Sequence, residues 1–307
     1  MQTTAHILMV RPANFGFNEE TAASNAFQST DTQLSLEEIS QKAIAEFDQF
    51  VTTLRSNGID VIVAEDSPEP VKPDAIFPNN WVTLHSDGKM ILYPMYAPVR
   101  RLERQAHIIK MLKKSFQIKM IIHLEEAEIT GQYLEGTGSM ILDREDKIVY
   151  ACLSPRTNTL VLDRFCAHTG FRPVVFHAVD GAGQDIYHTN VMMALGETFV
   201  VICLETIKDE SELANLKATF EQTGKTIIPI TLDQMLHFAG NMLQVRNTSG
   251  DTFLVMSEQA YNSLTDDQIA MINQHTQILH SPIYTIEKFG GGSARCMMAE
   301  VFARPKV

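Results

Sequence analysis

Cysteine is scarce in this chain of 307 residues, and its spacing matches neither a metal site nor a small-domain disulfide framework. The sequence has no CxxC pair and lacks the HExxH, GxxxxGK[ST] and strand-linked GxGxxG motifs. We therefore expect reduced thiols, no metal and no nucleotide cofactor. The four cysteines are Cys152, Cys166, Cys203 and Cys296.

Long apolar runs are missing as well. The sequence has no run of 18 apolar residues, which is the length that a membrane-spanning helix needs. Residues 1–6 lack the basic and apolar regions of a signal peptide. Basic residues are in deficit, and the net charge of -12 argues against nucleic acid or an anionic membrane as the partner. We expect a cytoplasmic protein that acts on a small molecule, with a homodimer compatible with these features.

Linker tracts rich in Pro, Ser and Gly are also absent, although a chain of this length would ordinarily suggest two domains. A hydrophobic content of 45% is enough to bury a large core. Ring and barrel architectures of this length often form one unit. We expect residues 1–307 to form a single domain.

The same order of elements recurs four times from Phe77 onward: a strand, a hairpin turn, a second strand, a helix and a third strand. The N-terminal part supplies a strand at 7–10, a helix at 34–56 and a strand at 60–64, and the C-terminal strand at 296–302 needs them to complete a fifth unit. The sequence therefore predicts an α/β ring of five strand-strand-helix-strand units, closed by the two ends of the chain. The four other helices are expected at 99–115, 160–168, 211–222 and 266–275.

Register within this repeat gathers polar residues that are far apart in the sequence. The residues that open the hairpins are separated by 59, 51, 51 and 55 positions, and equivalent positions in a closed ring point toward its axis. A purely structural repeat would place apolar residues there, whereas the alternative reading is that these residues only form turns before strands. The hairpin-opening residues are Asn80, Ser139, Asn190, Asn241 and Cys296, and the polar groups expected in one pocket are Asn80, Glu135, His188, Asn190 and Cys296.

Cys296 is the strongest candidate nucleophile. Three glycines, Gly290 to Gly292, precede it and allow a close approach of the backbone, while Cys152 and Cys203 lie inside apolar runs where an inert role is expected. Considered alone, Cys296 is better explained as a small core residue, and the rest of the repeat reverses that reading. A cysteine thiol titrates at about 8.5 and needs a nearby cation or base to ionise. Arg295 and His188 are the candidates for that role.

His188 and Glu135 are the acid and base groups that the repeat favours. His188 lies at a repeat junction and has the chemistry of a general base and acid, although a single histidine is more often structural. Glu135 is followed by small residues, which let a ligand approach the backbone closely. The alternative reading of Glu135 is a solvated loop acid.

Six short motifs, taken in order, resemble the guanidino-group modifying superfamily, which includes arginine deiminases, dimethylarginine dimethylaminohydrolases and glycine amidinotransferases. The resemblance spans nearly the whole chain. It implies the pentein fold, an α/β propeller of five ββαβ units around a pseudo-fivefold axis. The motifs are FPNNW (77–81), APVRRLE (97–103), LEGTG (134–138), LSPRTN (153–158), HTN (188–190) and GGGSARC (290–296).

The resemblance also implies roles for individual residues. Cys296 would be the nucleophile, His188 the acid and base, and Glu135 its carboxylate partner. Arg100 and Arg156 would bind the α-carboxylate of the substrate, although adjacent Arg100 and Arg101 cannot be told apart by sequence. Asn80 and Asn190 would bind the reacting group, and the first stretch, with Asn14 and Asn25, would lie over the pocket as a lid.

Asn80 and Asn190 depart from relatives that act on arginine-like substrates, which usually have aspartate at both positions. A carboxylate pairs with a cationic guanidinium, whereas an amide both donates and accepts hydrogen bonds, as a neutral ureido group does. We therefore hypothesise hydrolysis of citrulline to ornithine through an S-carbamoyl intermediate on Cys296. Similar sequences described as citrulline-utilisation hydrolases point the same way.

Three other readings stay open. An arginine deiminase or an amidinotransferase would keep the fold and the thiol chemistry but use a guanidino substrate. A pentein that binds without catalysis is disfavoured because Cys296, His188 and Glu135 are present together. A cysteine peptidase is disfavoured because the thiol begins a terminal strand and not a helix.

Overall fold

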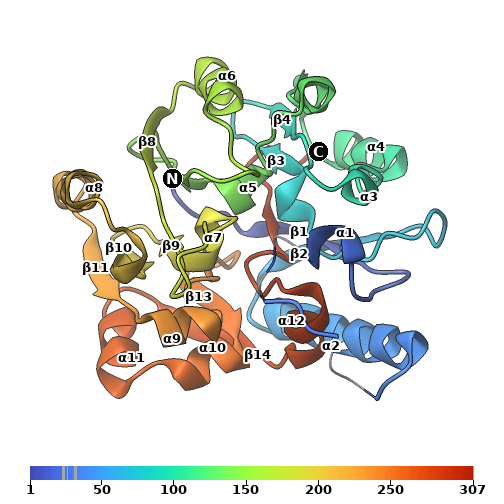
Figure 1. Cartoon of the computed structure of the whole chain (residues 1–307). Helices are drawn as coiled ribbons and strands as arrows, with labels where there is room; N and C mark the ends of the chain where they lie inside the picture. The colour runs from blue at the N-terminus through green and yellow to red at the C-terminus, as the bar shows by residue number, and fades with distance from the viewer. Residues whose placement is uncertain (23–24, 26, 31–32, 307) are drawn as a thin grey trace.

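Five three-stranded sheets surround a central axis in the computed structural model, which describes residues 1–22, 25, 27–30 and 33–306 (Figure 1). In every sheet the first strand of the unit pairs antiparallel with the second, and the second pairs parallel with the third. Four sheets are β3 (Val82–Leu84), β4 (Lys89–Leu92) and β5 (Met120–His123); β6 (Ile141–Asp143), β7 (Ile148–Cys152) and β8 (Arg172–Phe176); β9 (Met193–Leu195), β10 (Phe199–Ile202) and β11 (Thr226–Pro229); and β12 (Leu243–Arg246), β13 (Thr252–Ser257) and β14 (Gln277–Ser281).

The fifth sheet joins the two ends of the chain, as the repeat predicts. It contains β15 (Ala299–Glu300), β1 (His6–Arg11) and β2 (Asp60–Glu65) in that order. Ile7 pairs with Glu300 across the antiparallel contact and with Val61 across the parallel one. The C-terminal strand is therefore buttressed by the N-terminal strand, and the five ββαβ units form a closed α/β ring.

One helix of each unit lies at the periphery of the ring (Figure 1). The first, α2, begins with a capping box, in which Ser35 Oγ accepts a hydrogen bond from the Glu38 N–H at 3.2 Å. Such a cap stabilises a helix by about 1 kcal/mol. Leu36, the first residue of the helix, is 72% exposed because the buried face begins at Ile39. These helices are α2 (Leu36–Ser56), α4 (Ala106–Ser115), α6 (Thr159–Thr169), α8 (Glu210–Gln222) and α11 (Asp266–Asn273).

Short helical turns, and not strands, contain most of the residues predicted to open the hairpins. Asn80, Ser139 and Asn190 lie in the turns η1 (Pro78–Asn80), α5 (Gly136–Ser139) and α7 (Thr189–Met192), and each turn leads into the first strand of its unit. The predicted strand at 296–302 is likewise wrong at its start. Cys296 N–H donates to Ser293 O at 2.9 Å, so the chain is still turning there and pairs only at Ala299.

The remaining short elements connect the units. The helix predicted at 99–115 is interrupted, because α3 (Pro98–Arg101) ends before α4 begins. A helix that the sequence did not predict, α12 (Tyr284–Gly290), packs against α2 and leads to the three glycines. Within the described part of the chain, we find no helix with the length and apolar character needed to cross a membrane. The other elements are α1 (Glu19–Ala22), η2 (Glu125–Thr130), η3 (Leu204–Thr206), α9 (Leu232–Leu236) and α10 (Glu258–Ser263).

Candidate active site

Cys296 lies in the turn between α12 and β15, where glycine is required for the approach of the chain. Gly291 has a φ of 62°, in the left-handed region that favours glycine. A Cβ at this position would lie 2.5 Å from Asn25 Nδ2, so no larger residue fits beneath that side chain. The thiol delivered by this turn is buried, with 6% of the residue exposed.

Two asparagine side chains face the sulfur of Cys296. Nδ2 of Asn190 is 3.4 Å from Sγ, and Nδ2 of Asn241 is 3.3 Å from it. Asn241 is itself held in place, because it also donates to Asn190 O at 2.9 Å and accepts from the Arg295 N–H at 3.1 Å. Two N–H donors aimed at one sulfur stabilise negative charge on it.

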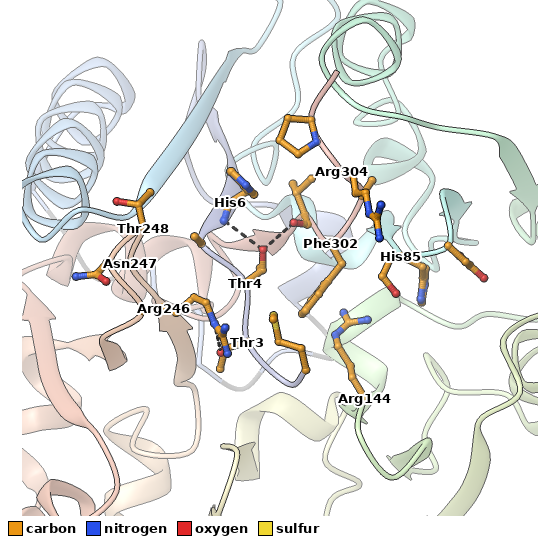
Figure 2. Close-up of a pocket in the computed structure, with 18 of the residues that line it drawn as sticks. Thr3, Thr4, His6, His85, Arg144, Arg246, Asn247, Thr248, Phe302 and Arg304 are labelled. Carbon is orange, nitrogen blue, oxygen red and sulfur yellow. Dashed lines mark hydrogen bonds between the residues drawn. The ribbon is translucent and has the colours of Figure 1, made fainter. Parts of the chain in front are cut away.

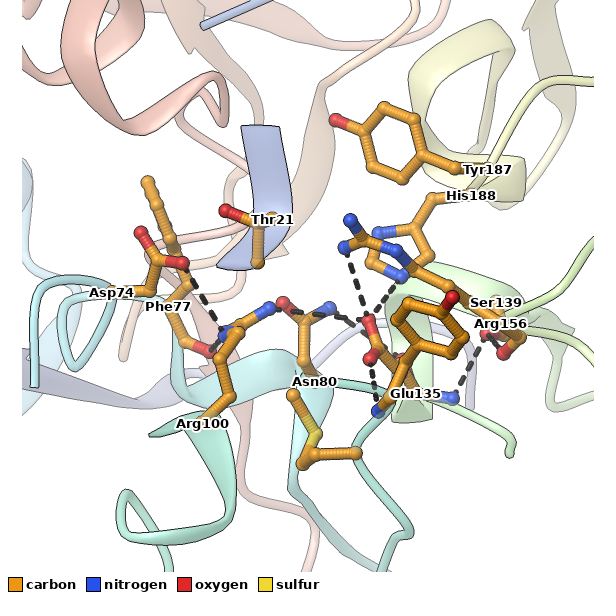
Figure 3. Close-up of polar contacts among 12 residues, drawn as sticks. Thr21, Asp74, Phe77, Asn80, Arg100, Glu135, Ser139, Arg156, Tyr187 and His188 are labelled. Atoms are coloured by element: carbon orange, nitrogen blue, oxygen red, sulfur yellow. Dashed lines mark hydrogen bonds and ion pairs between the residues drawn. The ribbon is translucent and has the colours of Figure 1, made fainter. Parts of the chain in front are cut away.

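His188 and Glu135 form a buried hydrogen-bonded pair beside this site (Figure 3). His188 Nε2 is 2.7 Å from Glu135 Oε2, and Glu135 Oε1 accepts a hydrogen bond from the Tyr96 N–H at 2.8 Å. Since an ionised carboxylate only accepts hydrogen bonds, Nε2 carries the proton and Nδ1 of the neutral ring holds the lone pair. The pair therefore provides an oriented base.

The glycines after Glu135 allow this close packing. Gly136 has a φ of 48°, and a Cβ on Gly138 would lie 2.3 Å from Asn80 Nδ2 and 2.7 Å from His188 Nδ1. The LEGTG segment therefore needs glycine at both positions, because a Cβ on Gly136 would lie 2.3 Å from Asn79 O and a side chain on Gly138 would displace the asparagine or the imidazole.

Opposing effects fix the ionisation of the pair. Burial alone would raise the pKa of Glu135, but Arg156, the hydrogen bond from His188 and the charge of Arg100 outweigh burial and hold that pKa well below its usual range. Burial lowers the pKa of His188 to about 4, although Glu135 opposes that change. At neutral pH the carboxylate is therefore charged and the imidazole is neutral.

A small cavity joins these groups. It has a volume of about 20 Å³, which is room for about one water molecule, and both Cys296 and His188 line it. Glu135 lies behind His188 and does not line the cavity. The lining residues are Thr21, Asn25, Asp74, Phe77, Asn80, Arg100, Arg156, Tyr187, His188, Gly290, Gly291, Gly292 and Cys296.

The cavity distinguishes Arg100 from Arg101. Arg100 is buried against the cavity, and its Nε and Nη2 donate to Glu103 at 2.8 and 3.1 Å. Arg101 instead donates to Met95 O at 3.1 Å and does not line the cavity. Arg156 does line it, and its guanidinium lies 4.8 Å from the centre of the Tyr187 ring.

One sequence expectation holds only in part, and another is wrong in its geometry. Arg295, a candidate cation for the thiol, donates to Met298 O and to Glu300 and does not line the cavity, although its charge still interacts with Cys296. Asn14 was placed in a lid, but it donates to Pro68 O at 2.8 Å, away from the cavity. Arg295 is held by Glu300 because that carboxylate follows it by five residues across the turn.

Asp74 is a cavity residue that the sequence interpretation missed. It is buried, its Oδ2 accepts from Asn18 Nδ2 at 2.7 Å, and its Oδ1 has no hydrogen-bond partner within the described chain. Burial raises its pKa, while Arg100 opposes the rise. Its position three residues before the FPNNW motif was the available signal. Tyr187 and Thr21, which also line the cavity, were missed as well. Asn241, which contacts Cys296 Sγ, was recognised only as a repeat position.

Cys152 and Cys203 have the properties of inert thiols. Burial raises the pKa of the Cys152 thiol to about 12 and that of Cys203 to about 11, so both stay protonated as expected. In the ranges that the structure describes, no three His, Cys, Asp or Glu side chains are grouped as metal ligands.

Comparison with known proteins identifies the family. The sequence matches the family described as N,N dimethylarginine dimethylhydrolase, eukaryotic, over residues 11–303. A comparison with curated proteins gives no match.

Solved structures share the ring. The N-terminal domain of ArgZ, covalently bound to a reaction intermediate, has a TM-score of 0.75 and 15% identity, and the match covers 96% of this chain and 97% of that one. Full-length ArgZ, an arginine dihydrolase from the ornithine-ammonia cycle in cyanobacteria, has a TM-score of 0.75 and 15% identity, with 98% of this chain matching 41% of that chain.

A dimethylarginine dimethylaminohydrolase, solved as an adduct with S-methyl-L-thiocitrulline, has a TM-score of 0.64 and 13% identity over 97% of this chain and 99% of that one. At such identities the structural likeness establishes only the pentein fold. Membership of the family rests on the match to the family over residues 11–303. The chain therefore belongs to the N,N-dimethylarginine dimethylhydrolase family and is a cysteine-dependent hydrolase of the guanidino-group modifying superfamily.

Proposed function

We propose that the protein hydrolyses the ureido group of citrulline to give ornithine, with Cys296 as the nucleophile, His188 as the base and acid, and Glu135 as the carboxylate that orients His188. The observation that carries this proposal is the neutral character of the groups around the thiol. Asn190 and Asn241 donate to Sγ from outside the cavity lining, and Asn80 lines the cavity together with Cys296.

Neutral amides suit a neutral reacting group. Asn190 Oδ1 is buried and has no hydrogen-bond partner within the described residues, so it is available to accept an N–H of the substrate. Asn80 can both donate and accept. A ureido group offers one carbonyl oxygen and N–H donors, whereas a guanidinium offers donors only and brings a positive charge that the amides cannot neutralise.

The amino acid end of the substrate would bind beside Arg100. Asp74 Oδ2 lies 3.7 Å from Arg100 Nε, and a carboxylate beside a guanidinium complements the ammonium and carboxylate of an α-amino acid. The unpaired Oδ1 of Asp74 would accept from the ammonium. Arg156 adds a second cation for the α-carboxylate.

The reaction would proceed in two stages. In the first, His188 takes the thiol proton, the thiolate of Cys296 attacks the ureido carbon, and the bond from that carbon to the side-chain nitrogen breaks. His188 returns the proton to the leaving nitrogen, which releases ornithine. In the second, His188 takes a proton from water, the hydroxide attacks the S-carbamoyl carbon, and the carbon–sulfur bond breaks. His188 returns the proton to the sulfur, and the released carbamic acid decomposes to ammonia and carbon dioxide.

Substrate entry requires the residues over the cavity to move, because about 20 Å³ cannot hold an amino acid. Asn25 donates to the carbonyl oxygens of Gly290 and Gly291 at 3.4 Å each, and Gln28 donates to Gly290 O at 3.2 Å. Opening would break these contacts. We infer that Asn25 belongs to a lid, as the sequence predicts.

A second candidate is an arginine hydrolase. The buried carboxylate of Asp74 favours it, because that group could pair with a guanidinium instead of an ammonium. The likeness to an arginine dihydrolase is compatible with this activity.

The test is a comparison of substrates on one enzyme preparation. Ornithine release from citrulline would be measured beside citrulline and ornithine release from arginine and from dimethylarginine, with glycine added in parallel to detect amidino transfer. We expect citrulline to have the largest kcat/KM. We expect no transfer of an amidino group from arginine to glycine. Faster turnover of arginine or dimethylarginine would reject the ureido preference.

A further inference from the structure

A second and larger cavity lies at the opposite ends of the first strands. Its volume is about 790 Å³, within the range typical of ligand sites. It is lined by the hairpin turns after β3, β6 and β12 and by chain segments near residues 1–6 and 301–305 (Figure 2). The catalytic residues precede these strands, whereas the hairpin turns follow them. We call this space the turn-side cavity, and none of its residues lines the catalytic cavity.

The charge of the turn-side cavity is opposite to that of the chain. Four Lys and Arg residues line it against a single acid, Asp87, although the whole chain has 25 Lys and Arg against 37 Asp and Glu. Asp87 is already paired with Lys89 at 2.7 Å. Of the four cations, Arg246 is neutralised by Glu197 at 2.9 Å, which leaves Arg144, Lys147 and Arg304.

The side chain of Arg144 is buried, and its guanidinium has N–H donors that form no hydrogen bond within the described residues. Its side chain is 8% exposed, and its Nη2 has no hydrogen-bond partner within the described residues. The guanidinium lies 4.0 Å from the centre of the Phe302 ring, and Nε is 3.5 Å from Glu300 Oε1. Glu300 is shared, because it also binds Arg295 at 2.9 Å. A buried guanidinium with unused donors is costly unless a further acceptor binds there.

Lys147 and Arg304 complete a cationic group around the same space. Lys147 Nζ lies 4.7 Å from the centre of the Phe171 ring, and neither residue forms an ion pair within the described part of the chain. Burial first, and then repulsion by the nearby charge of Arg144, lower the pKa of Lys147, while the charge of Asp87 opposes the change. A multiply charged anion would relieve this repulsion.

We propose that the turn-side cavity binds a small organic anion with at least two negative charges, held by Arg144, Lys147 and Arg304. Phosphoryl and carboxylate oxygens share the acceptor chemistry that these donors require. Either a phosphate-bearing metabolite or a polycarboxylate would satisfy it, and the site is independent of the catalytic cavity.

Calorimetric titration of the full chain tests the proposal. Inorganic pyrophosphate and citrate would each be titrated into the protein, with NaCl holding the ionic strength constant. We expect one saturable site per chain for at least one of them, and the anion that binds identifies the source. Lys147→Gln and Arg304→Gln, both at exposed residues, should each weaken binding by about tenfold, since each removes one charge-assisted contact.

Two controls make the outcome decisive. Lys217→Gln removes an exposed charge on α8, outside this cavity, and should bind as the wild type does. Arg144→Gln should abolish binding, and thermal unfolding would check its fold because that residue also contacts Glu300. Failure of both anions to bind, or equal binding by the wild type and by Lys147→Gln and Arg304→Gln, would overturn the proposal.

Discussion

Asn80→Asp should shift the substrate preference from citrulline toward arginine. Asn80 is buried beside the catalytic cavity, and its Nδ2 donates to Glu135 O at 3.5 Å. The substitution keeps the shape of the side chain but replaces a donor and an acceptor with a charged acceptor. A carboxylate here would lose its hydrogen bond to a ureido oxygen and gain a charge-assisted one from a guanidinium.

The magnitude follows from the hydrogen bonds exchanged. A neutral hydrogen bond contributes about 1 kcal/mol and a charge-assisted one about 1.5–3 kcal/mol. Arginine therefore gains about 1 kcal/mol in transition-state stabilisation, and citrulline loses about 1 kcal/mol. The combined change of about 2 kcal/mol corresponds to about a 30-fold fall in the kcat/KM for citrulline relative to the kcat/KM for arginine.

Steady-state assays of ornithine formation from citrulline and product formation from arginine give this ratio. Both substrates are measured on one preparation, so the fraction of active enzyme cancels. The matched control is Asn79→Asp, because Asn79 is also buried in η1 but does not line the cavity. A ratio that stays within about threefold of the wild type in Asn80→Asp would refute the reasoning.

Three further outcomes are expected. Cys296→Ser should abolish turnover and remove the mass increase that a haloacetamidine produces on the wild-type protein; labelling of the serine variant would show another nucleophile. Glu135→Gln should lower kcat by about a hundredfold or more in assays of ornithine release, because His188 loses the carboxylate at 2.7 Å. The control Glu126→Gln, at an exposed residue of η2, should leave kcat unchanged. Since burial lowers the folded pKa of His188 from 6.5 to about 4, the folded state resists protonation and loses stability as pH falls from 6.5 toward 4. Between pH 7 and pH 5 the wild type should therefore lose about 2 kcal/mol more unfolding free energy than His188→Asn in denaturant titrations, and equal losses would contradict this pKa.

The repeat made the ring predictable. Alternating apolar residues, hairpin turns and capped helices recur at nearly constant spacing, so local patterns identify each unit and their number requires the ends of the chain to join. The capping box at Ser35 and Glu38 and the pairing of β15 with β1 follow from such patterns. The boundaries near Asn80, Asn190 and Cys296 were less predictable, because one helical turn before a strand has too few residues to show a period.

The sequence by itself determined which residue types stand at equivalent points of the ring, and hence that a thiol, an imidazole, a carboxylate and several amides share one end of it. Tertiary structure alone decided which side chains face one another. It turned Arg295 toward Glu300 and Arg101 toward Met95 O, and it brought Asp74 to the catalytic cavity. The physical reason is that the partner of each side chain depends on competition among groups that are distant in sequence. The repeat pattern in the sequence predicts only the local backbone structure of each unit.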